Sequence, residues 1–88
     1  MKKKLLIVSY NDFANSKLST ILEVQPNSRK ILETTWLIST TDTAKEFYTK
    51  IEPYFDKDNQ KVFIAEFISD QRQGWLSRAS WDWIKGNQ

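Results

Sequence analysis

Three segments of the sequence are apolar at consecutive positions, and they constrain the fold more than any other feature: residues 5–8, 36–38 and 62–65. Their branched, aromatic and leucine side chains are typical of β-strands. A strand that is covered on one face alternates apolar and polar residues, because successive side chains point to opposite faces of the sheet. These three segments do not alternate. Both faces of the predicted sheet must therefore be covered.

Two helices are predicted between the strands. The first contains residues 18–22, whose apolar side chains lie three and four residues apart, and Asn15 or Ser16 can cap it. The second begins at Thr43, where the sequence matches a capping box, and it ends or kinks at Pro53, which lacks a backbone N–H.

The order of these elements predicts the fold class. Strands are expected within residues 3–10, 30–40 and 61–68, and the middle range is interpreted as two short strands bent near Glu33 and Thr34. The order is then β-α-β-β-α-β followed by a Trp-rich C-terminal tail. It predicts an α+β, ferredoxin-like sandwich with both helices on one face of the sheet.

Length and composition predict one domain over residues 1–88, with residues 75–88 as a C-terminal tail or short helix. The chain has no Cys and no His, which excludes disulfides and the usual zinc ligands. Association is the remaining way to stabilise so small a domain. The sheet face without helices must be covered by the tail, by a second subunit or by both, so we expect a homodimer with its sheets face to face.

The N-terminus is basic but does not match a targeting segment. The apolar run at residues 5–8 is too short for a signal peptide. No stretch approaches the roughly 20 apolar residues that span a membrane. We therefore expect a soluble, cytoplasmic protein with no membrane partner.

Several short motifs follow one another in a recognisable order: the strand Leu6 to Tyr10, the stretch Leu32 to Ile38, the Thr43-Ala44 helix start, Ile51-x-Pro53 and the turn Asp56-Lys57-Asp58. Together they resemble the SinR-type proteins, which are relatives of CRISPR-associated protein two (Cas-two) and of the VapD toxins. The similarity covers roughly residues 4–76.

The resemblance implies a ferredoxin-like fold, a dimer with sheets packed face to face, and a function. The favoured function is a non-catalytic dimeric binding or scaffold module acting on nucleic acid, nucleotide or protein. Some Cas-two proteins and the VapD toxins are reported as nucleases, so the first alternative is a metal-dependent endonuclease of RNA or DNA. The second alternative is a nucleotide-sequestering protein that captures a small phosphorylated ligand between subunits.

Asn11 and Asp12 are the candidate metal ligands, and Asp12 is the candidate catalytic residue. In the Cas-two group an Asp directly follows the Tyr that ends the first strand, and two such carboxylates paired across a dimer could hold Mg²⁺. Here Asn11 occupies that place and Asp12 follows it. Asn is neutral, and a shift by one residue redirects the side chain. We therefore favour a turn and helix cap at this pair, no enzymatic activity, and no cofactor unless Mg²⁺ serves a nuclease.

Scattered basic residues are the candidates for phosphate contacts. The net charge is only +2, and phosphate contacts need no particular spacing, so surface Lys and Arg are more often simply solvated. The candidates for nucleic-acid binding are Lys2, Lys3, Lys4, Arg29, Lys30, Arg72 and Arg78.

The four Trp residues divide into one in a strand and three in the tail. Trp36 is predicted to lie in the core. Trp75, Trp81 and Trp83 could stack on a base or nucleotide, or they could seal the open face of the sheet or the dimer seam. The pattern favours packing, above all for Trp81, which lies about one helical turn before Ile84.

Overall fold

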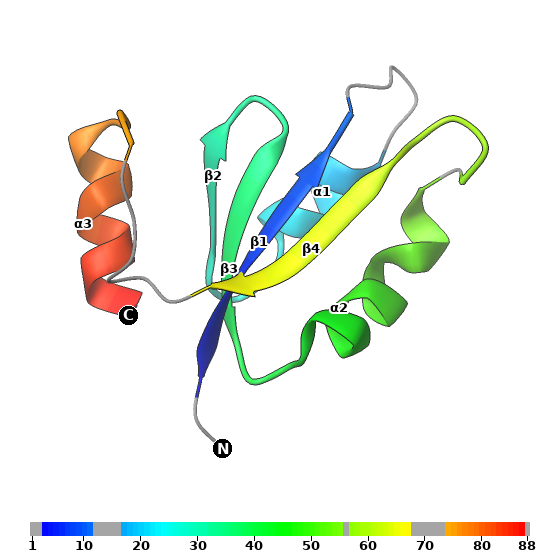
Figure 1. Cartoon of the computed structure of the whole chain (residues 1–88), viewed down its shortest axis with the longest axis horizontal. Coiled ribbons are helices and arrows are strands. Elements are labelled where there is room, and N and C mark those ends of the chain that lie inside the picture. The colour runs from blue at the N-terminus through cyan, green and yellow to red at the C-terminus, as the bar shows by residue number, and fades with distance from the viewer. Residues whose placement is uncertain (1–2, 12–16, 56, 68–73, 88) are drawn as a thin grey trace.

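The computed structural model describes residues 3–11, 17–55, 57–67 and 74–87. Four strands form an antiparallel sheet in the order β2-β3-β1-β4, with three α-helices beside it (Figure 1). The elements along the chain are β1 (Lys4–Tyr10), α1 (Leu18–Glu23), β2 (Ser28–Leu32), β3 (Thr35–Thr40), α2 (Ala44–Ile51), the 3₁₀ helix η1 (Glu52–Tyr54), β4 (Val62–Phe67) and α3 (Arg78–Asn87). The predicted small α+β fold is confirmed, and the strand order is compatible with a ferredoxin-like arrangement.

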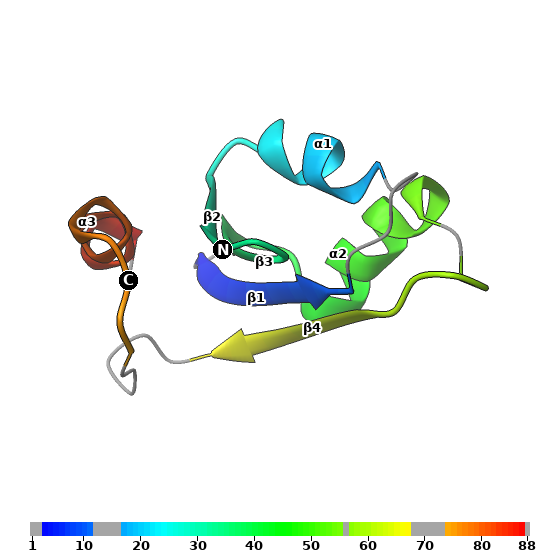
Figure 2. The same cartoon turned by 90° about the horizontal axis from the view of Figure 1, so that it is seen from above.

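Helices α1 and α2 lie on the same side of the sheet, as Figure 2 shows from above. The main core lies between these helices and the sheet. It contains apolar side chains from both helices, β1 and β3, all of them buried: Leu6, Val8, Leu18, Leu22, Trp36, Ile38, Phe47 and Ile51. Trp36 is thus a core residue, as predicted, and its indole Nε1 donates a hydrogen bond to the hydroxyl of Tyr10 at 3.2 Å.

Helix α2 begins as the sequence predicts. The hydroxyl of Thr43 accepts a hydrogen bond from the backbone N–H of Glu46 at 3.1 Å, and the Glu46 carboxylate accepts one from the backbone N–H of Thr43 at 2.8 Å. These reciprocal bonds satisfy two backbone donors that the first turn leaves without helical partners. Helix α2 is followed directly by η1, which contains Pro53. The predicted caps of α1, Asn15 and Ser16, lie outside the described residues.

The segment between the two helices forms a hairpin of two short strands, β2 and β3, that turns at Glu33 and Thr34, as predicted. A register shift between Lys30 and Leu32 interrupts the alternation of β2. Lys30 lies opposite Trp36, whereas Leu32 lies opposite Thr35. Because directly opposed residues share a face, this shift moves Leu32 to the sheet face away from α1 and α2.

The C-terminal tail folds into α3, which lies beside β2 and apart from α1 and α2 (Figures 1 and 2). Ser77 precedes the helix, and its hydroxyl accepts a hydrogen bond from the backbone N–H of Ser80 at 3.3 Å, as an N-cap side chain does. The guanidinium Nε of Arg29 in β2 donates to the hydroxyl of Ser80 at 3.2 Å. Ser80 and Ile84 are the buried residues of α3.

Candidate functional site

The candidate site is the face of the sheet opposite α1 and α2, named the second face below. Directly opposed residues form rows across the four strands. One row runs from Leu32 through Thr35 and Ser9 to Phe63. In its centre the hydroxyls of Ser9 and Thr35 are hydrogen-bonded to each other at 3.1 Å, which leaves the two ends of the row apolar.

A second row runs parallel to the first, one pleat further along the sheet. It contains Arg29, Leu37, Ile7 and Ala65 in strand order from β2 to β4. Leu37 is buried and Ile7 is half-buried. Strands β1 and β3 therefore carry apolar side chains on both faces of the sheet. Those on one face pack against α1 and α2, and those on the other lie on the second face.

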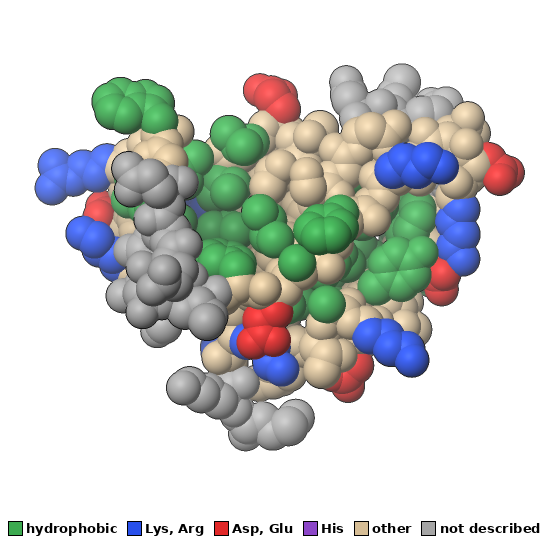
Figure 3. All heavy atoms as spheres, in the orientation of Figure 1, with side chains coloured by type: hydrophobic (Ala, Val, Ile, Leu, Met, Phe, Trp, Pro, Cys, Tyr) green, Lys and Arg blue, Asp and Glu red, His purple; other side chains and the backbone are tan. Residues whose placement is uncertain are grey.

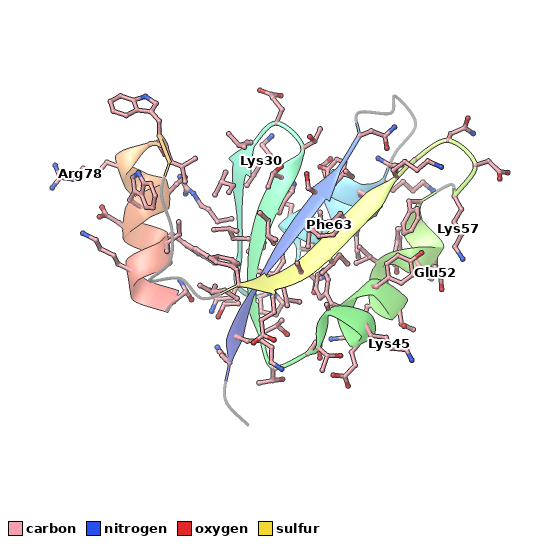
Figure 4. All side chains as sticks on the ribbon, viewed as in Figure 1. Lys30, Lys45, Glu52, Lys57, Phe63 and Arg78 are labelled. Atoms are coloured by element: carbon pink, nitrogen blue, oxygen red, sulfur yellow. The ribbon has the colours of Figure 1, made fainter. Side chains whose placement is uncertain are left out.

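The ends of the first row are exposed to solvent. The side chain of Leu32 is 56% exposed and that of Phe63 is 65% exposed. Phe63 projects from β4 toward the viewer in Figure 4, and apolar side chains gather over the same strands in Figure 3. The exposed side chains of Phe63 and Leu32 therefore form an apolar surface of the kind that binds other proteins.

The tail covers only part of this face, because α3 lies at the β2 side (Figure 2). Of the three tail tryptophans, Trp81 and Trp83 are half-buried, whereas Trp75 is 97% exposed. Within one chain Trp75, which lies before the helix begins, does not seal the open face of the sheet, and its place in a dimer seam stays a prediction. The β4 side of the second face has no covering element among the described residues.

Asn11, a candidate metal ligand, joins the end of β1 to the loop before β4. Its Nδ2 donates to the carbonyl oxygen of Asn59 at 3.3 Å, and its Oδ1 accepts from the backbone N–H of Lys61 at 2.5 Å. The buried side chain of Gln60 donates to the Asn11 carbonyl oxygen at 3.0 Å. Both polar atoms of the Asn11 side chain thus bond to the loop before β4 and fix it to the end of β1. Asp12, the candidate catalytic residue of the nuclease alternative, lies outside the described residues.

Among the described residues, the acidic side chains do not gather into a metal centre. In the part of the chain that the structure describes, no three Asp or Glu side chains lie close enough together to hold an ion. The Lys57 ammonium illustrates the surface character of the charges: its hydrogen bond to the Glu52 carboxylate raises the pKa of the Lys57 side chain, yet both groups lie at the surface near η1 (Figure 4). Such exposed pairs add little to stability.

The structure separates the predicted phosphate-binding residues. Arg29 and Lys30 are neighbours in β2 whose side chains point to opposite faces, and Arg29 is engaged by Ser80. Lys3 and Lys4 lie at the beginning of β1. Arg78 begins α3 and projects away from the sheet (Figure 4). These five residues do not form a common basic rim, and Lys2 and Arg72 lie outside the described residues.

A small hollow lies at the other end of the sheet, between the loop before β2, the end of β3 and the last turn of α2. Lys3, Asn27, Thr41 and Lys50 are among the residues that line it. The Lys50 ammonium is already paired with the Asp42 carboxylate at 2.6 Å, which offsets its charge toward an anion. This hollow is therefore weaker as a site than the second face.

The residues that matter most on the second face, Leu32 and Phe63, were not among the predicted site residues. The consecutive apolar residues at 62–65 indicated that Phe63 would lie on a second covered face. For Leu32 the strand pattern gave no such signal, because its position depends on the register shift in β2.

Comparison with known proteins adds no relative: no family model matches the chain, and neither a curated protein nor a solved structure shows significant similarity to it. Among the helices formed by the described residues, none has the length and apolar character needed to cross a membrane. The resemblance to SinR-type proteins thus stays a prediction from the motifs.

Proposed function

We propose that this protein is a non-catalytic dimeric binding module, as in the SinR and Cas-two group that its motifs resemble, and that two copies pack through their second faces. The observation that supports it is the pair of exposed apolar side chains, Leu32 and Phe63, at the ends of one row across the sheet. Burying such a surface against a second sheet removes apolar area from water, at about 25 cal/mol per Å².

The chemistry of the second face favours a protein partner over nucleic acid. Its rows carry Leu, Phe, Ile, Ala and hydroxyl side chains, and their one cationic group, the Arg29 guanidinium, already donates to Ser80. Binding to a phosphate backbone depends on several free cationic side chains along one surface. A second copy, by contrast, presents the same apolar rows and buries them symmetrically.

The mass in solution tests this proposal. The Leu32→Lys variant should have half the mass of the wild type by light scattering during size-exclusion chromatography at micromolar concentration, because a charge would be placed in the contact. Val24→Lys is the matched control, since Val24 is 68% exposed in the turn after α1, on the helix side of the sheet. A wild type with the mass of one chain, or a Leu32→Lys variant with unchanged mass, would exclude the face-to-face dimer.

The proposal also predicts that the protein does not cleave nucleic acid. Labelled RNA and DNA should remain intact after incubation with the protein in Mg²⁺ or in Mn²⁺, because Asn11 uses both of its polar side-chain atoms in structural hydrogen bonds. Metal-dependent cleavage that disappears in Asp12→Ala would replace the proposed function with that of an endonuclease. Metal-dependent cleavage that survives in Asp12→Ala would also contradict the proposal.

A further inference from the structure

The two edges of the sheet differ in their protection. β2 and β4 are the outer strands, and α3 lies beside β2 (Figure 1). Natural proteins protect an exposed edge with proline, lysine, a bulge or a covering element, since its free N–H and C=O groups can pair with another chain. β4 runs from Val62 to Phe67 without Pro, Lys or a register shift, and its one charged residue is Glu66.

The hydrogen bonds of β1 show which β4 backbone groups point outward. The N–H of Tyr10 donates to the carbonyl of Thr34 on the β3 side, whereas the N–H of Asn11 donates to Lys61 on the β4 side. In an antiparallel sheet the backbone groups of successive residues point to alternate sides. Phe63, Ala65 and Phe67 in β4 therefore face β1 through their partners Ser9, Ile7 and Leu5.

It follows that the residues between them face away from the sheet. The N–H and C=O groups of Val62, Ile64 and Glu66 point to the outer edge, where no strand among the described residues pairs with them. This edge offers three donors and three acceptors in a regular row, flanked by the exposed ring of Phe63. That is the arrangement to which an extended strand adds.

The symmetry of this row selects its partner. When two copies of one strand pair antiparallel, a two-fold axis perpendicular to the sheet relates them. Because directly opposed residues share a face of the sheet, one residue on this axis must lie opposite its own copy. With Ile64 on the axis, Val62 lies opposite the second copy's Glu66, and all three outward residues form hydrogen-bonded pairs. An axis at Phe63 or Ala65 pairs only two of them, and an axis at Glu66 sets two carboxylates against each other.

We propose that the outer edge of β4 pairs antiparallel with β4 of a second copy, with Ile64 of both copies on the two-fold axis. In this register Phe63 lies opposite the small side chain of Ala65 of the second copy, which gives the exposed ring a partner surface on the second face. The pairing joins the two sheets into one continuous sheet. It goes beyond the proposed function, because the outer edge and the second face are different surfaces, and a chain that uses both assembles beyond a dimer.

The absence of Cys from the chain permits a direct test with single-cysteine variants. Hydrogen-bonded pairs in an antiparallel sheet have Cα atoms about 5.5 Å apart, which suits a disulfide. Ile64→Cys should therefore form a covalent dimer under mild oxidation. Thr49→Cys, at an exposed position of α2, is the control that should remain a single chain. In the face-to-face dimer the two residues at position 64 lie on the helix side of their sheets and cannot meet.

A backbone substitution separates edge pairing from chance collision. Glu66→Pro removes an outward N–H and blocks the edge, and the exposed Glu66 side chain leaves the core untouched. In the Ile64→Cys chain, Glu66→Pro should abolish the disulfide, whereas Glu66→Thr should retain it. Leu32→Lys should leave the disulfide intact, because Leu32 lies in β2 at the opposite edge. A folded Ile64→Cys chain that stays uncross-linked, or that cross-links despite Glu66→Pro, overturns the proposal, and cross-linking through Ala65→Cys alone overturns the register.

Discussion

Replacement of Trp36 with alanine should lower the free energy of unfolding by about 3–5 kcal/mol. Trp36 is 6% exposed and packs in the core between the sheet and the two helices, so truncation leaves a cavity that its neighbours cannot fill. It also removes the indole N–H that bonds to the Tyr10 hydroxyl. Small domains have a total stability of about 5–15 kcal/mol, so this variant should be close to unfolded or fail to accumulate. Urea unfolding followed by circular dichroism measures the effect.

Trp75→Ala is the matched control for this experiment, because it makes the same chemical change at a side chain that is 97% exposed. Its free energy of unfolding should stay within about 0.5 kcal/mol of the wild type. Trp36→Phe retains most of the buried area and loses the indole donor, so it separates packing from hydrogen bonding. If Trp36→Ala and Trp75→Ala lowered the free energy of unfolding by the same amount, Trp36 would not be the buried core residue that the structure describes.

Replacement of Ile84 with alanine should cost about 2–5 kcal/mol, the range for buried aliphatic side chains. Ile84 is 3% exposed and belongs to the buried side of α3 together with Ser80. The substitution should weaken the docking of α3 beside β2, where the hydrogen bond from Arg29 to Ser80 is one polar contact between them. Urea unfolding gives the free energy, and limited proteolysis reports whether cleavage begins within α3.

Two substitutions on the same helix provide the comparison for Ile84→Ala. Asp82 is exposed, so Asp82→Ala should change stability by less than about 0.5 kcal/mol. Trp81 is half-buried, so Trp81→Ala should cost less than Ile84→Ala even though it removes more atoms. An Ile84→Ala variant that unfolds and resists protease like the wild type would mean that α3 does not stabilise the domain through this side chain.

Local sequence rules predicted the elements of this fold well, because each rule acts within a few residues. The capping box at Thr43 depends on side chains that bond to nearby backbone, and the turn at Glu33 and Thr34 depends on short-range chain geometry. The same holds for the burial of Trp36 within an apolar strand. The α+β class then follows from the order of the elements.

The candidate site was less predictable, because its residues meet only across the sheet. Asn11 was a candidate metal ligand from its place after Tyr10, with a turn and helix cap favoured, but its hydrogen-bond partners, Asn59 and Lys61, come from a loop about fifty residues away. The basic residues were grouped by type, and the structure separates them by face and by element. For the tail, periodicity indicated Trp81 as the buried residue, whereas the docking of α3 buries Ser80 and Ile84.

The sequence by itself determined that the sheet has two apolar faces, since consecutive apolar residues in a strand leave no other geometry. Only the tertiary structure decided how those faces are used. The register shift between Lys30 and Leu32 moves one leucine to the second face, and the side on which α3 docks leaves Phe63 and the outer edge of β4 exposed. Register and docking depend on contacts between segments far apart in the chain, and the side-chain pattern of a single strand does not contain them.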